Sequence, residues 1–423
     1  MKTMAKIKLL TAPYKNYNHF MQPVALGLIK NLLKENNIDS DIDDLYAKLY
    51  HAQKRGLVNL DSVSAEEWKR YAKGEQIKKT EDILKKIVHL THFKDYEILM
   101  FSTTPPATSA DIDDYLVQGL FRYLKEKSNV KIISSRPLEM KNEDFTIESI
   151  PGLFETLKEL GFEIKNAQIG TKQDLEGLNM NLYKHHGIIV AGYYFYNGCP
   201  YNCAFCDRYA LDKAKPYEER VRLPDPKNVV SDLKEFVDKY KLDKFMFHNT
   251  TVNPTEKFGK ELAEEMKKQD LNIMWADCAN LKPMSTELLD KLKETGCTKL
   301  VFGFETASKK LQKMIRKDID IAHTERILRH CYEIGIWAEV TLLCGLPYET
   351  NEDIYETLLF IKRNYKFLRG INLNIFMMKM NDFRLNPEKY DIRLREKGNE
   401  FNPVGFDEIN GMKWEEKEKY TWR

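Results

Sequence analysis

The 423-residue sequence has no excess of either charge, no long apolar segment and few cysteines. It carries 66 lysines and arginines against 64 aspartates and glutamates, so bulk charge does not favour binding to nucleic acid or to an anionic membrane. No apolar segment is long enough to cross a bilayer, and the first residues lack the apolar stretch and small-residue cleavage site of a secretory signal. We therefore expect a cytoplasmic protein whose partners include neither a membrane nor nucleic acid.

The cysteines are too few for a disulfide framework. There are seven in the chain, an odd number, and stabilising disulfides are rare in reducing compartments. Four stand singly in apolar or helical surroundings, which suits buried, inert thiols: Cys278, Cys297, Cys331 and Cys344. The other three, Cys199, Cys203 and Cys206, lie within eight residues and carry the strongest chemical signal in the chain.

These three closely spaced cysteines predict a metal centre. Thiolates are soft ligands, and a short loop that holds several of them can bind an iron–sulfur cluster. Structural zinc prefers four protein ligands in two pairs, but the sequence has no second Cys-x-x-Cys pair and no His-x-x-x-His pair. A [4Fe-4S] cluster held by Cys199, Cys203 and Cys206 would keep one iron without a protein ligand, and that iron would be open to chemistry.

The spacing of the cysteines, with Phe205 before the last of them, resembles the radical S-adenosylmethionine (radical SAM) superfamily. The resemblance implies that SAM binds the open iron through its amino and carboxylate groups. It further implies reductive cleavage of SAM to methionine and a 5′-deoxyadenosyl radical, which abstracts hydrogen from an unactivated carbon. An external one-electron donor such as flavodoxin or ferredoxin would be a partner.

Strand and helix patterns alternate six times over residues 183–380. Repeated β–α units predict a parallel barrel, and six units rather than eight predict a partial (β/α)6 barrel of the TIM type. The cysteine loop follows the first predicted strand, 187–195, at the end where such barrels carry their catalytic groups. Motif and architecture therefore indicate the same site.

Further residues at predicted strand ends extend the resemblance, which implies a SAM-binding role for each. Phe205 is implied to lie beside the adenine, and Glu305 to face the ribose hydroxyls or the methionine ammonium. Gly345 and Leu346 resemble the start of a turn whose backbone approaches the adenine. Asn249 stands where the family often carries acidic residues that bind the amino group of SAM.

Three positions depart from the family pattern. Tyr348 replaces a glycine that is usual in the turn after the fifth strand. Cys278 stands where related proteins often carry arginine; it could donate a hydrogen atom to a substrate radical, bind a metal, or be a buried core thiol. His248 could transfer protons near neutral pH or be a structural histidine.

Residues 1–180 show strand–helix alternation that predicts a Rossmann-like, doubly wound parallel sheet. Ligands of such sheets bind beyond the strand carboxyl ends, here near residues 12–13, 102–104 and 134–135. The Pro23-Val-Ala-Leu-Gly-Leu segment resembles the opening of the cobalamin-binding-like domain that precedes many radical SAM cores, with Asp43 or Asp44 ending the second strand. The Asp-x-His-x-x-Gly signature of an axial histidine is missing. The domain either binds cobalamin without that histidine or shapes the substrate pocket without a cofactor.

Two segments lie outside this alternation. Residues 51–93 carry helix starts at Ser64 and near Thr80, and we interpret them as a helical insertion, a lid or an oligomer contact. Residues 381–423 form a short C-terminal extension without cysteine, so it cannot hold an auxiliary thiolate-bound cluster. Its aromatic residues are expected to pack, to cap the open barrel or to contact substrate: Phe401, Phe406, Trp414, Tyr420 and Trp422.

The leading hypothesis is a radical SAM enzyme that performs cobalamin-dependent methyl transfer. Without cobalamin, epimerisation, rearrangement or ring formation would be expected, with Cys278 as a hydrogen donor. An iron–sulfur electron carrier or sensor is the alternative from another class, although the segments around Glu305 and Gly345 count against it. A zinc-organised scaffold is the third. The residues do not distinguish a small-molecule substrate from a peptide or protein.

Overall fold

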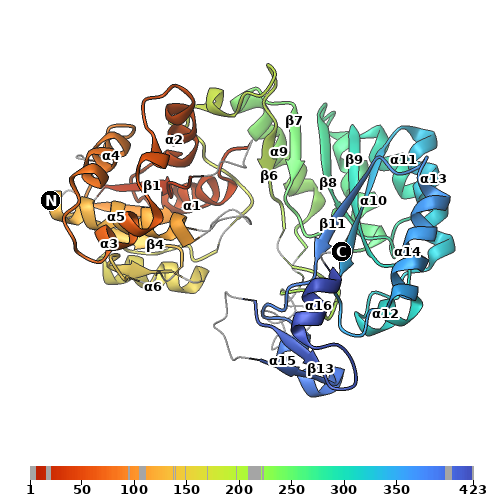
Figure 1. Cartoon of the computed structure of the whole chain (residues 1–423). Helices are drawn as coiled ribbons and strands as arrows, with labels where there is room; N and C mark the ends of the chain where they lie inside the picture. The colour runs from red at the N-terminus through yellow and green to blue at the C-terminus, as the bar shows by residue number, and fades with distance from the viewer. Residues whose placement is uncertain are drawn as a thin grey trace. The chain divides into compact units, whose positions relative to one another are not determined.

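A computed structural model of the chain describes residues 6–15, 21–93, 96–103, 111–136, 138, 140–147, 149–168, 170–196, 198–207, 221, 223–395 and 403–421. The chain divides into two compact units. The first comprises Met1–Gly192 with Phe236–Leu242, and the second comprises Tyr193–Glu235 with Asp243–Arg423 (Figure 1).

The first unit contains a five-stranded sheet in the order β2-β1-β3-β4-β5, and every pairing between neighbours is parallel. Its strands are β1 (Ile7–Thr11), β2 (Ser40–Asp43), β3 (Ile98–Ser102), β4 (Lys131–Ser134) and β5 (Phe145–Thr146). Its helices are α1 (Val24–Glu35), α2 (Leu45–Lys54), α3 (Ala65–Ala72), α4 (Lys78–Val88), α5 (Asp111–Lys127) and α6 (Ile150–Glu159), with 3-10 turns η1 (Leu60–Ser62) and η2 (Met180–Tyr183).

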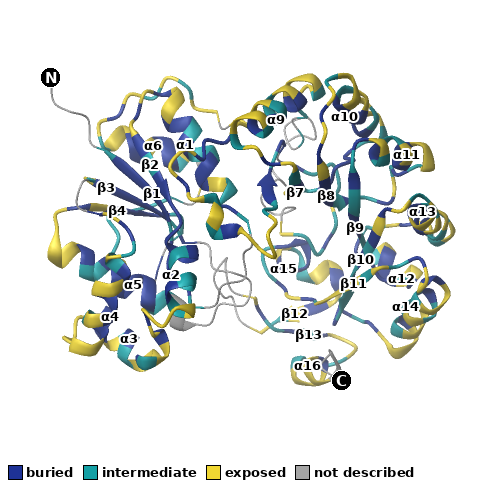
Figure 2. Ribbon diagram, turned by 90° about the horizontal axis from the view of Figure 1, so that it is seen from above, coloured by how far each residue is buried: buried dark blue, intermediate teal, exposed yellow. Residues whose placement is uncertain are grey.

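Burial explains why this sheet is parallel and central. In β1, Ile7, Leu9 and Leu10 are fully buried although neighbouring side chains point to opposite faces, so helices cover both faces of the strand (Figure 2). The strand order changes direction between β1 and β3, which makes that point the topological switch of the sheet. The predicted Rossmann-like fold of the N-terminal region is confirmed.

The predicted insertion is helical and belongs to the core of the first unit. Ser64 caps α3 through a reciprocal capping box with Glu67, as its sequence indicated. Trp68 and Tyr71 of α3 are almost fully buried, and a Cβ at Gly119 of α5 would lie 3.4 Å from the Tyr71 ring. The helix therefore packs closely against α5, where even a single added methyl group at Gly119 would be in van der Waals contact with Tyr71 and Trp68.

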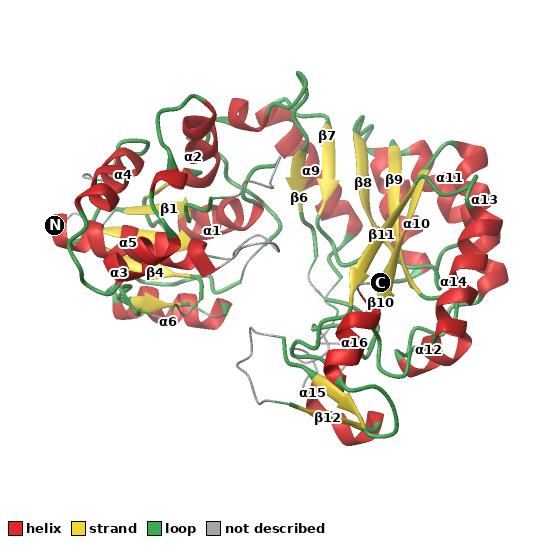
Figure 3. Cartoon of the chain, viewed as in Figure 1, coloured by secondary structure: helices red, strands yellow, loops and turns green. Residues whose placement is uncertain are grey.

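The second unit contains a six-stranded sheet in the order β11-β10-β9-β8-β7-β6, with parallel pairings from β7 to β11 (Figure 3). The strands are β6 (Ala191–Tyr193), β7 (Lys244–Phe247), β8 (Met274–Ala279), β9 (Cys297–Glu305), β10 (Trp337–Cys344) and β11 (Gly370–Ile375). The intervening helices are α9 (Pro226–Tyr240), α10 (Glu256–Lys268), α11 (Thr286–Glu294), α12 (Lys309–Met314), α13 (Ile321–Ile334) and α14 (Asn351–Asn364). Each strand pairs with the next along the chain, which confirms the partial (β/α)6 barrel.

The first barrel strand is shorter than the expected 187–195. Strand β6 spans only Ala191–Tyr193, because His185 and Ile188 pair with each other in a local bridge before it. Gly187, between them, has a φ of +84°, which turns the chain.

The C-terminal extension folds as part of the second unit. It consists of α15 (Asp382–Leu385), η3 (Pro387–Tyr390), β12 (Ile392–Leu394), β13 (Phe406–Glu408) and α16 (Trp414–Thr421). Strands β12 and β13 pair antiparallel, and Phe406 and Trp414 pack together, which meets the expectation of simple packing for these two aromatics. Phe401, Trp422 and the Tyr420 side chain lie outside the described residues. Over the described part of the chain, no helix combines the length and apolar character that crossing a membrane requires.

Candidate active site

The cysteine loop, residues 199–206, follows β6 at the carboxyl end of the barrel strands. Gly198, at its start, has a φ of +130° and pairs with Val221, so a residue with a side chain would be strained there. The loop is closed by a hydrogen bond from the Cys206 N–H to the Cys203 carbonyl at 3.2 Å. The Ala204 N–H donates to the Ile315 carbonyl at 3.0 Å, which ties the loop to the end of α12.

The three thiols are half-buried neighbours on this loop. Burial raises the pKa of the Cys199 thiol to about 11, and both Cys203 and Cys206 act electrostatically on it. Among the described residues, no three His, Cys, Asp or Glu side chains converge on one point that could hold a single metal ion. Structural zinc usually takes four protein ligands, whereas a [4Fe-4S] cluster can be held by three thiolates, each on a different iron. The donor set therefore fits a cluster better than a zinc ion.

A buried ion pair faces the cysteine loop. Glu305, at the end of β9, is 5% exposed, and one carboxylate oxygen lies 3.3 Å from Lys317 Nζ. The other oxygen accepts a hydrogen bond from Thr341 Oγ1 at 3.1 Å. Burial raises the pKa of Glu305, while the pKa of Lys317 is also raised because Glu305, Cys203 and Cys199 outweigh the effect of its own burial. The pair thus presents both signs of charge beside the thiols.

Backbone geometry positions this pair. Glu305 has a φ of +75°, a conformation that costs a non-glycine residue free energy and recurs at functional sites. A Cβ at Gly303, two residues before Glu305 on β9, would lie 2.6 Å from Lys317 Nζ, so the lysine side chain would have to shift if this glycine were replaced. Glu305 therefore provides the carboxylate, and the missing side chain at Gly303 leaves space beside Lys317.

Phe205 lies in the same region. Lys317 Nζ stands 5.8 Å from the centre of the Phe205 ring, within the range of a cation–π contact. The structure thus brings together Phe205, Glu305 and the three cysteines, with Lys317 between them. No pattern in the sequence distinguished Lys317 from the other lysines, because its contact with Glu305 depends on the turn after α12.

Asn249 has a different environment from the one expected for a SAM contact. It is 5% exposed, its Oδ1 accepts the Phe195 N–H at 3.1 Å, and its Nδ2 donates to Asp277 Oδ2 at 2.8 Å. Asp277 is fully buried and also accepts the Cys278 N–H at 2.8 Å. Asn249 and Asp277 therefore tie the ends of β6, β7 and β8 together, an arrangement that the sequence did not indicate.

Burial raises the pKa of Asp277 to about 8, against an ordinary value of 3.8, which predicts a pH-dependent stability. Between these values the folded state holds a proton that the unfolded state releases. The stabilisation is therefore complete below about pH 4 and is lost as pH rises through about 8, with a slope of up to about 1.4 kcal/mol per pH unit. Urea unfolding of the wild type at a series of pH values measures that slope.

Asp277→Asn should flatten this dependence. Asp243→Asn, at a side chain that is 66% exposed, serves as the control and should keep the wild-type slope. An unchanged slope in Asp277→Asn would show that Asp277 is ionised in the folded protein.

Cys278 lies on the half-buried side of β8, and burial raises the pKa of its thiol to about 11. Asp277 acts on it electrostatically in the same direction, whereas Lys299 and Lys317 act in the opposite direction. Its thiol therefore stays protonated at neutral pH, as a hydrogen donor would require. His248 is exposed, and its backbone N–H donates to the Tyr193 carbonyl at 2.8 Å.

The turn after β10 is rigid. Gly345 has a φ of +86°, and its N–H donates to Glu349 Oε2 at 2.6 Å, while Leu346 is fully buried. Tyr348, in place of the usual glycine, also has a positive φ, +55°. The C-terminal extension stabilises that conformation, since Glu408 Oε1 accepts the Tyr348 N–H at 2.7 Å.

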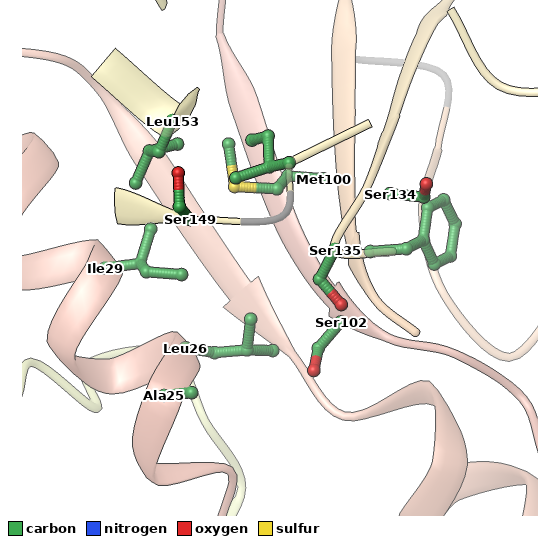
Figure 4. Close-up of a pocket in the computed structure, with 11 residues that line it drawn as sticks. Ala25, Leu26, Ile29, Met100, Ser102, Ser134, Ser135, Ser149 and Leu153 are labelled. Atoms are coloured by element: carbon green, nitrogen blue, oxygen red, sulfur yellow. The ribbon is translucent and has the colours of Figure 1, made fainter. Parts of the chain in front are cut away.

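The first unit has a cavity of about 310 Å³ at the carboxyl ends of β3 and β4 (Figure 4). Ala25, Leu26 and Ile29 of α1 line one wall, opposite the strand-end residues Ser102, Ser134 and Ser135. Residues 102 and 134–135 were expected at a ligand site; Thr104 lies outside the described residues. The cavity adjoins the topological switch of the sheet, where ligands of doubly wound folds bind.

Asp43 and Asp44 do not line this cavity. Asp44 caps α2 and accepts hydrogen bonds from Thr11 and Tyr183, and Asp43 pairs with Lys48 at 2.6 Å. Both carboxylates are therefore committed to the fold of the first unit.

The six-stranded barrel, the three-cysteine loop after its first strand and the charged pair beside that loop form one candidate site at the carboxyl ends of the strands. Residues 193–361 match the family model described as the radical SAM superfamily. The chain therefore contains a radical SAM domain, the domain of a family that uses a [4Fe-4S] cluster and SAM.

The chain is 25% identical over 186 residues to an uncharacterised methyltransferase of Pyrococcus horikoshii, covering 44% of this chain and 39% of that protein. It is 24% identical over 218 residues to the anaerobic magnesium-protoporphyrin IX monomethyl ester cyclase of Rubrivivax gelatinosus, covering 51% of this chain and 36% of the cyclase. The matched segments are thus less than half the length of either relative.

A similar solved structure is that of the radical SAM methyltransferase TsrM from Kitasatospora setae, with cobalamin and a [4Fe-4S] cluster bound. The TM-score is 0.62 at 13% sequence identity, and the match covers 95% of this chain and 83% of TsrM. The likeness shows a shared fold that includes both units.

Proposed function

We propose that this protein is a radical SAM enzyme that transfers a methyl group with the help of cobalamin. The observation that carries the first part is the buried Glu305–Lys317 pair beside Cys199, Cys203 and Cys206 at the carboxyl end of the barrel. An electron carrier needs the thiols but has no use for a charged pair next to them. The methyl-transfer part rests on the cavity of the first unit and on the likeness to TsrM.

The three cysteines fit a [4Fe-4S] cluster with one open iron. No other cysteine is part of the loop, and the four remaining ones lie on barrel strands and on α13. When bound, such a cluster supplies the electron that splits SAM into methionine and a 5′-deoxyadenosyl radical. The protein's own contribution is to bind SAM in one orientation and to exclude water from the reacting atoms.

Glu305 and Lys317 are the residues that would orient SAM. The methionine moiety of SAM carries an ammonium and a carboxylate, and the pair offers the opposite charge to each. Charge-assisted hydrogen bonds in a buried site are strong and directional, so the two groups would fix the amino-acid end of SAM. Phe205 would contribute an aromatic face beside them, and the rigid turn at Gly345 and Leu346 would accept the adenine.

The cavity in the first unit fits the nucleotide tail of cobalamin. Its walls are mainly apolar, with serine side chains at the strand ends, which suits an aromatic base joined to a polar sugar phosphate. When bound, cobalamin supplies a carrier for the methyl group. Ala25, Leu26 and Ile29 would pack against the base, and Ser102 and Ser135 would face the sugar phosphate.

The experiment is anaerobic reconstitution with iron, sulfide and hydroxocobalamin, followed by desalting and metal analysis. We expect about four irons, the content of one cubane, and about one cobalt per chain. Ala25→Trp, which adds bulk at an exposed position of the cavity wall, should lower bound cobalt about tenfold and leave iron unchanged. Glu155→Trp, exposed on α6 outside the cavity, is the control and should bind both metals.

The bound metals and the conversion of SAM distinguish the candidate functions. Iron without cobalt would contradict the cobalamin part and favour epimerisation, rearrangement or ring formation, with the protonated thiol of Cys278 as the hydrogen donor. If dithionite-reduced protein binds iron but does not convert SAM to 5′-deoxyadenosine, the protein is an electron carrier. Absence of both metals would overturn the proposal.

The proposed cluster chemistry also indicates the cellular compartment of the protein and the kind of electron donor it needs. A cluster with an open iron and free thiols is preserved in a reducing environment, so we place the protein in the cytoplasm. An external one-electron donor, of the flavodoxin or ferredoxin kind, would be required because the cluster must be reduced before it can pass an electron to SAM.

A further inference from the structure

The C-terminal extension contacts the cysteine loop directly. The Asp382 N–H donates to the Ala204 carbonyl at 3.0 Å, and the Asn381 side-chain amide donates to the Phe205 carbonyl at 3.3 Å. Ala204 and Phe205 are the two residues between Cys203 and Cys206. Both carbonyl groups of the span that joins two predicted cluster ligands are therefore held by consecutive residues of the extension.

The Asp382 carboxylate is buried and surrounded by donors. It is 1% exposed, pairs with Arg316 Nη1 at 2.8 Å and with Lys389 Nζ at 3.3 Å, and accepts the Tyr390 hydroxyl. Burial opposes its charge, but Tyr390 and Arg316 hold the pKa of Asp382 below the usual range. A buried carboxylate with this many partners is fixed in position.

Asp382 forms an ion pair with Arg316, the residue immediately before Lys317 in the chain. Arg316 and Asp318 have φ angles of +58° and +44°, so Lys317 lies between two non-glycine residues in the left-handed region. Such residues persist only when the surroundings hold them. The Arg316 side chain is held by Asp382, and the Ile315 carbonyl by the Ala204 N–H.

The same elements share one hydrophobic core. Ala204 of the loop, Ile315 at the end of α12, and Phe383 and Phe406 of the extension are all buried in it. Because the core is continuous, a shift of the extension would move the loop and the turn before Lys317 together.

We propose that Asn381 and Asp382 form a latch, built from the C-terminal extension, that positions both the cysteine loop and Lys317. This inference rests on the proposed function, in which the loop holds the cluster and Lys317 binds SAM. Asn381 and Asp382 are positioning residues, because neither would touch SAM. The C-terminal extension is therefore part of the site, because it positions site residues as well as covering the end of the barrel.

The test compares Asp382→Asn and Asn381→Ser with Asp391→Asn in the full-length chain. Asp382→Asn keeps the N–H to Ala204 but removes the charge that holds Arg316. Asn381→Ser keeps a side-chain oxygen for the Arg384 N–H at the start of α15 but removes the amide that holds Phe205. Asp391→Asn, exposed on the same extension and left-handed in φ, is the matched control.

Two measurements are made on each variant. In the metal-free protein, hydrogen exchange of residues 199–206 should be about fivefold faster in Asn381→Ser, because one hydrogen bond to the loop is lost. After reconstitution, both latch variants should lose iron to a chelator about tenfold faster than wild type, and Asp382→Asn should need about tenfold more SAM to change the spectrum of the reduced cluster. The control should stay within about twofold of wild type in each measurement.

The latch is overturned if loop exchange and iron release in both variants match those of Asp391→Asn. It is also overturned if the latch variants only lower the unfolding midpoint, since a merely structural role predicts that result. If the wild type binds no iron, the proposed function fails, while the exchange measurement in the metal-free protein still decides the latch.

Discussion

Replacing Cys203 with alanine is expected to abolish cluster binding and SAM cleavage together. The three thiols have no substitute, because no other cysteine is part of the loop and Lys317, a charged neighbour of the thiols, cannot bind iron as an ammonium. Iron content after anaerobic reconstitution should fall to background. Formation of 5′-deoxyadenosine should fall by roughly three orders of magnitude or more, which corresponds to at least about 4 kcal/mol in the activation barrier.

The matched control is Cys331→Ala. Cys331 is a fully buried thiol on α13, remote in sequence from the loop, so its loss removes a cysteine without touching the predicted cluster ligands. We expect this variant to retain about four irons per chain and wild-type SAM cleavage. Full iron content in Cys203→Ala, or loss of iron in Cys331→Ala, would contradict the assignment of the cluster to the loop.

Lys317→Met should weaken SAM binding strongly while leaving the cluster in place. Methionine keeps most of the side-chain volume but removes the ammonium that would meet the carboxylate of SAM. A hydrogen bond to a charged group contributes about 1.5–3 kcal/mol, so the KM for SAM should rise about 10- to 100-fold. Wild-type iron content and a wild-type rate of SAM cleavage at saturating SAM would show that SAM binding is weakened while the cluster is retained.

A second variant separates binding from stability. Lys317→Met leaves Glu305 buried without its cation, which is itself destabilising. In the double variant Glu305→Gln with Lys317→Met, the charge is removed from both partners, so stability should recover whereas SAM binding should not. Lys313→Met, exposed on α12, is the control and should resemble wild type. An unchanged KM in Lys317→Met would show that Lys317 only neutralises Glu305.

The fold could be predicted largely from local patterns. Apolar strands that alternate with amphipathic helices predicted both parallel sheets, and the structure contains both. The first barrel strand was overestimated because its apolar run, 187–195, continues past the point where the backbone leaves the sheet. Periodicity reports which residues are apolar, whereas strand ends depend on pairing partners that lie elsewhere in the chain.

The site could be predicted only where its residues are close in sequence. The three cysteines and the segment around Glu305 are local signals, and both lie at strand carboxyl ends as the barrel requires. The predicted contact of Asn249 with SAM rests on its position in the sequence alone, and the structure adds that its amide hydrogen-bonds to Phe195 and Asp277. Asp277 could not be foreseen as a partner, because it is on the neighbouring strand, 28 positions away.

By itself, then, the sequence determined the chemistry that the loop can support, because ligand type and spacing are written in eight consecutive residues. Only the tertiary structure decided how that loop is supported. Lys317 meets Glu305 through a left-handed turn at Arg316 and Asp318, and Asn381 holds Phe205 from 176 positions away. Neither contact can be read from the sequence, because each joins residues that are far apart along the chain and meet only when it is packed. Burial then strengthens these contacts, because electrostatic interactions are stronger in the protein interior than in water.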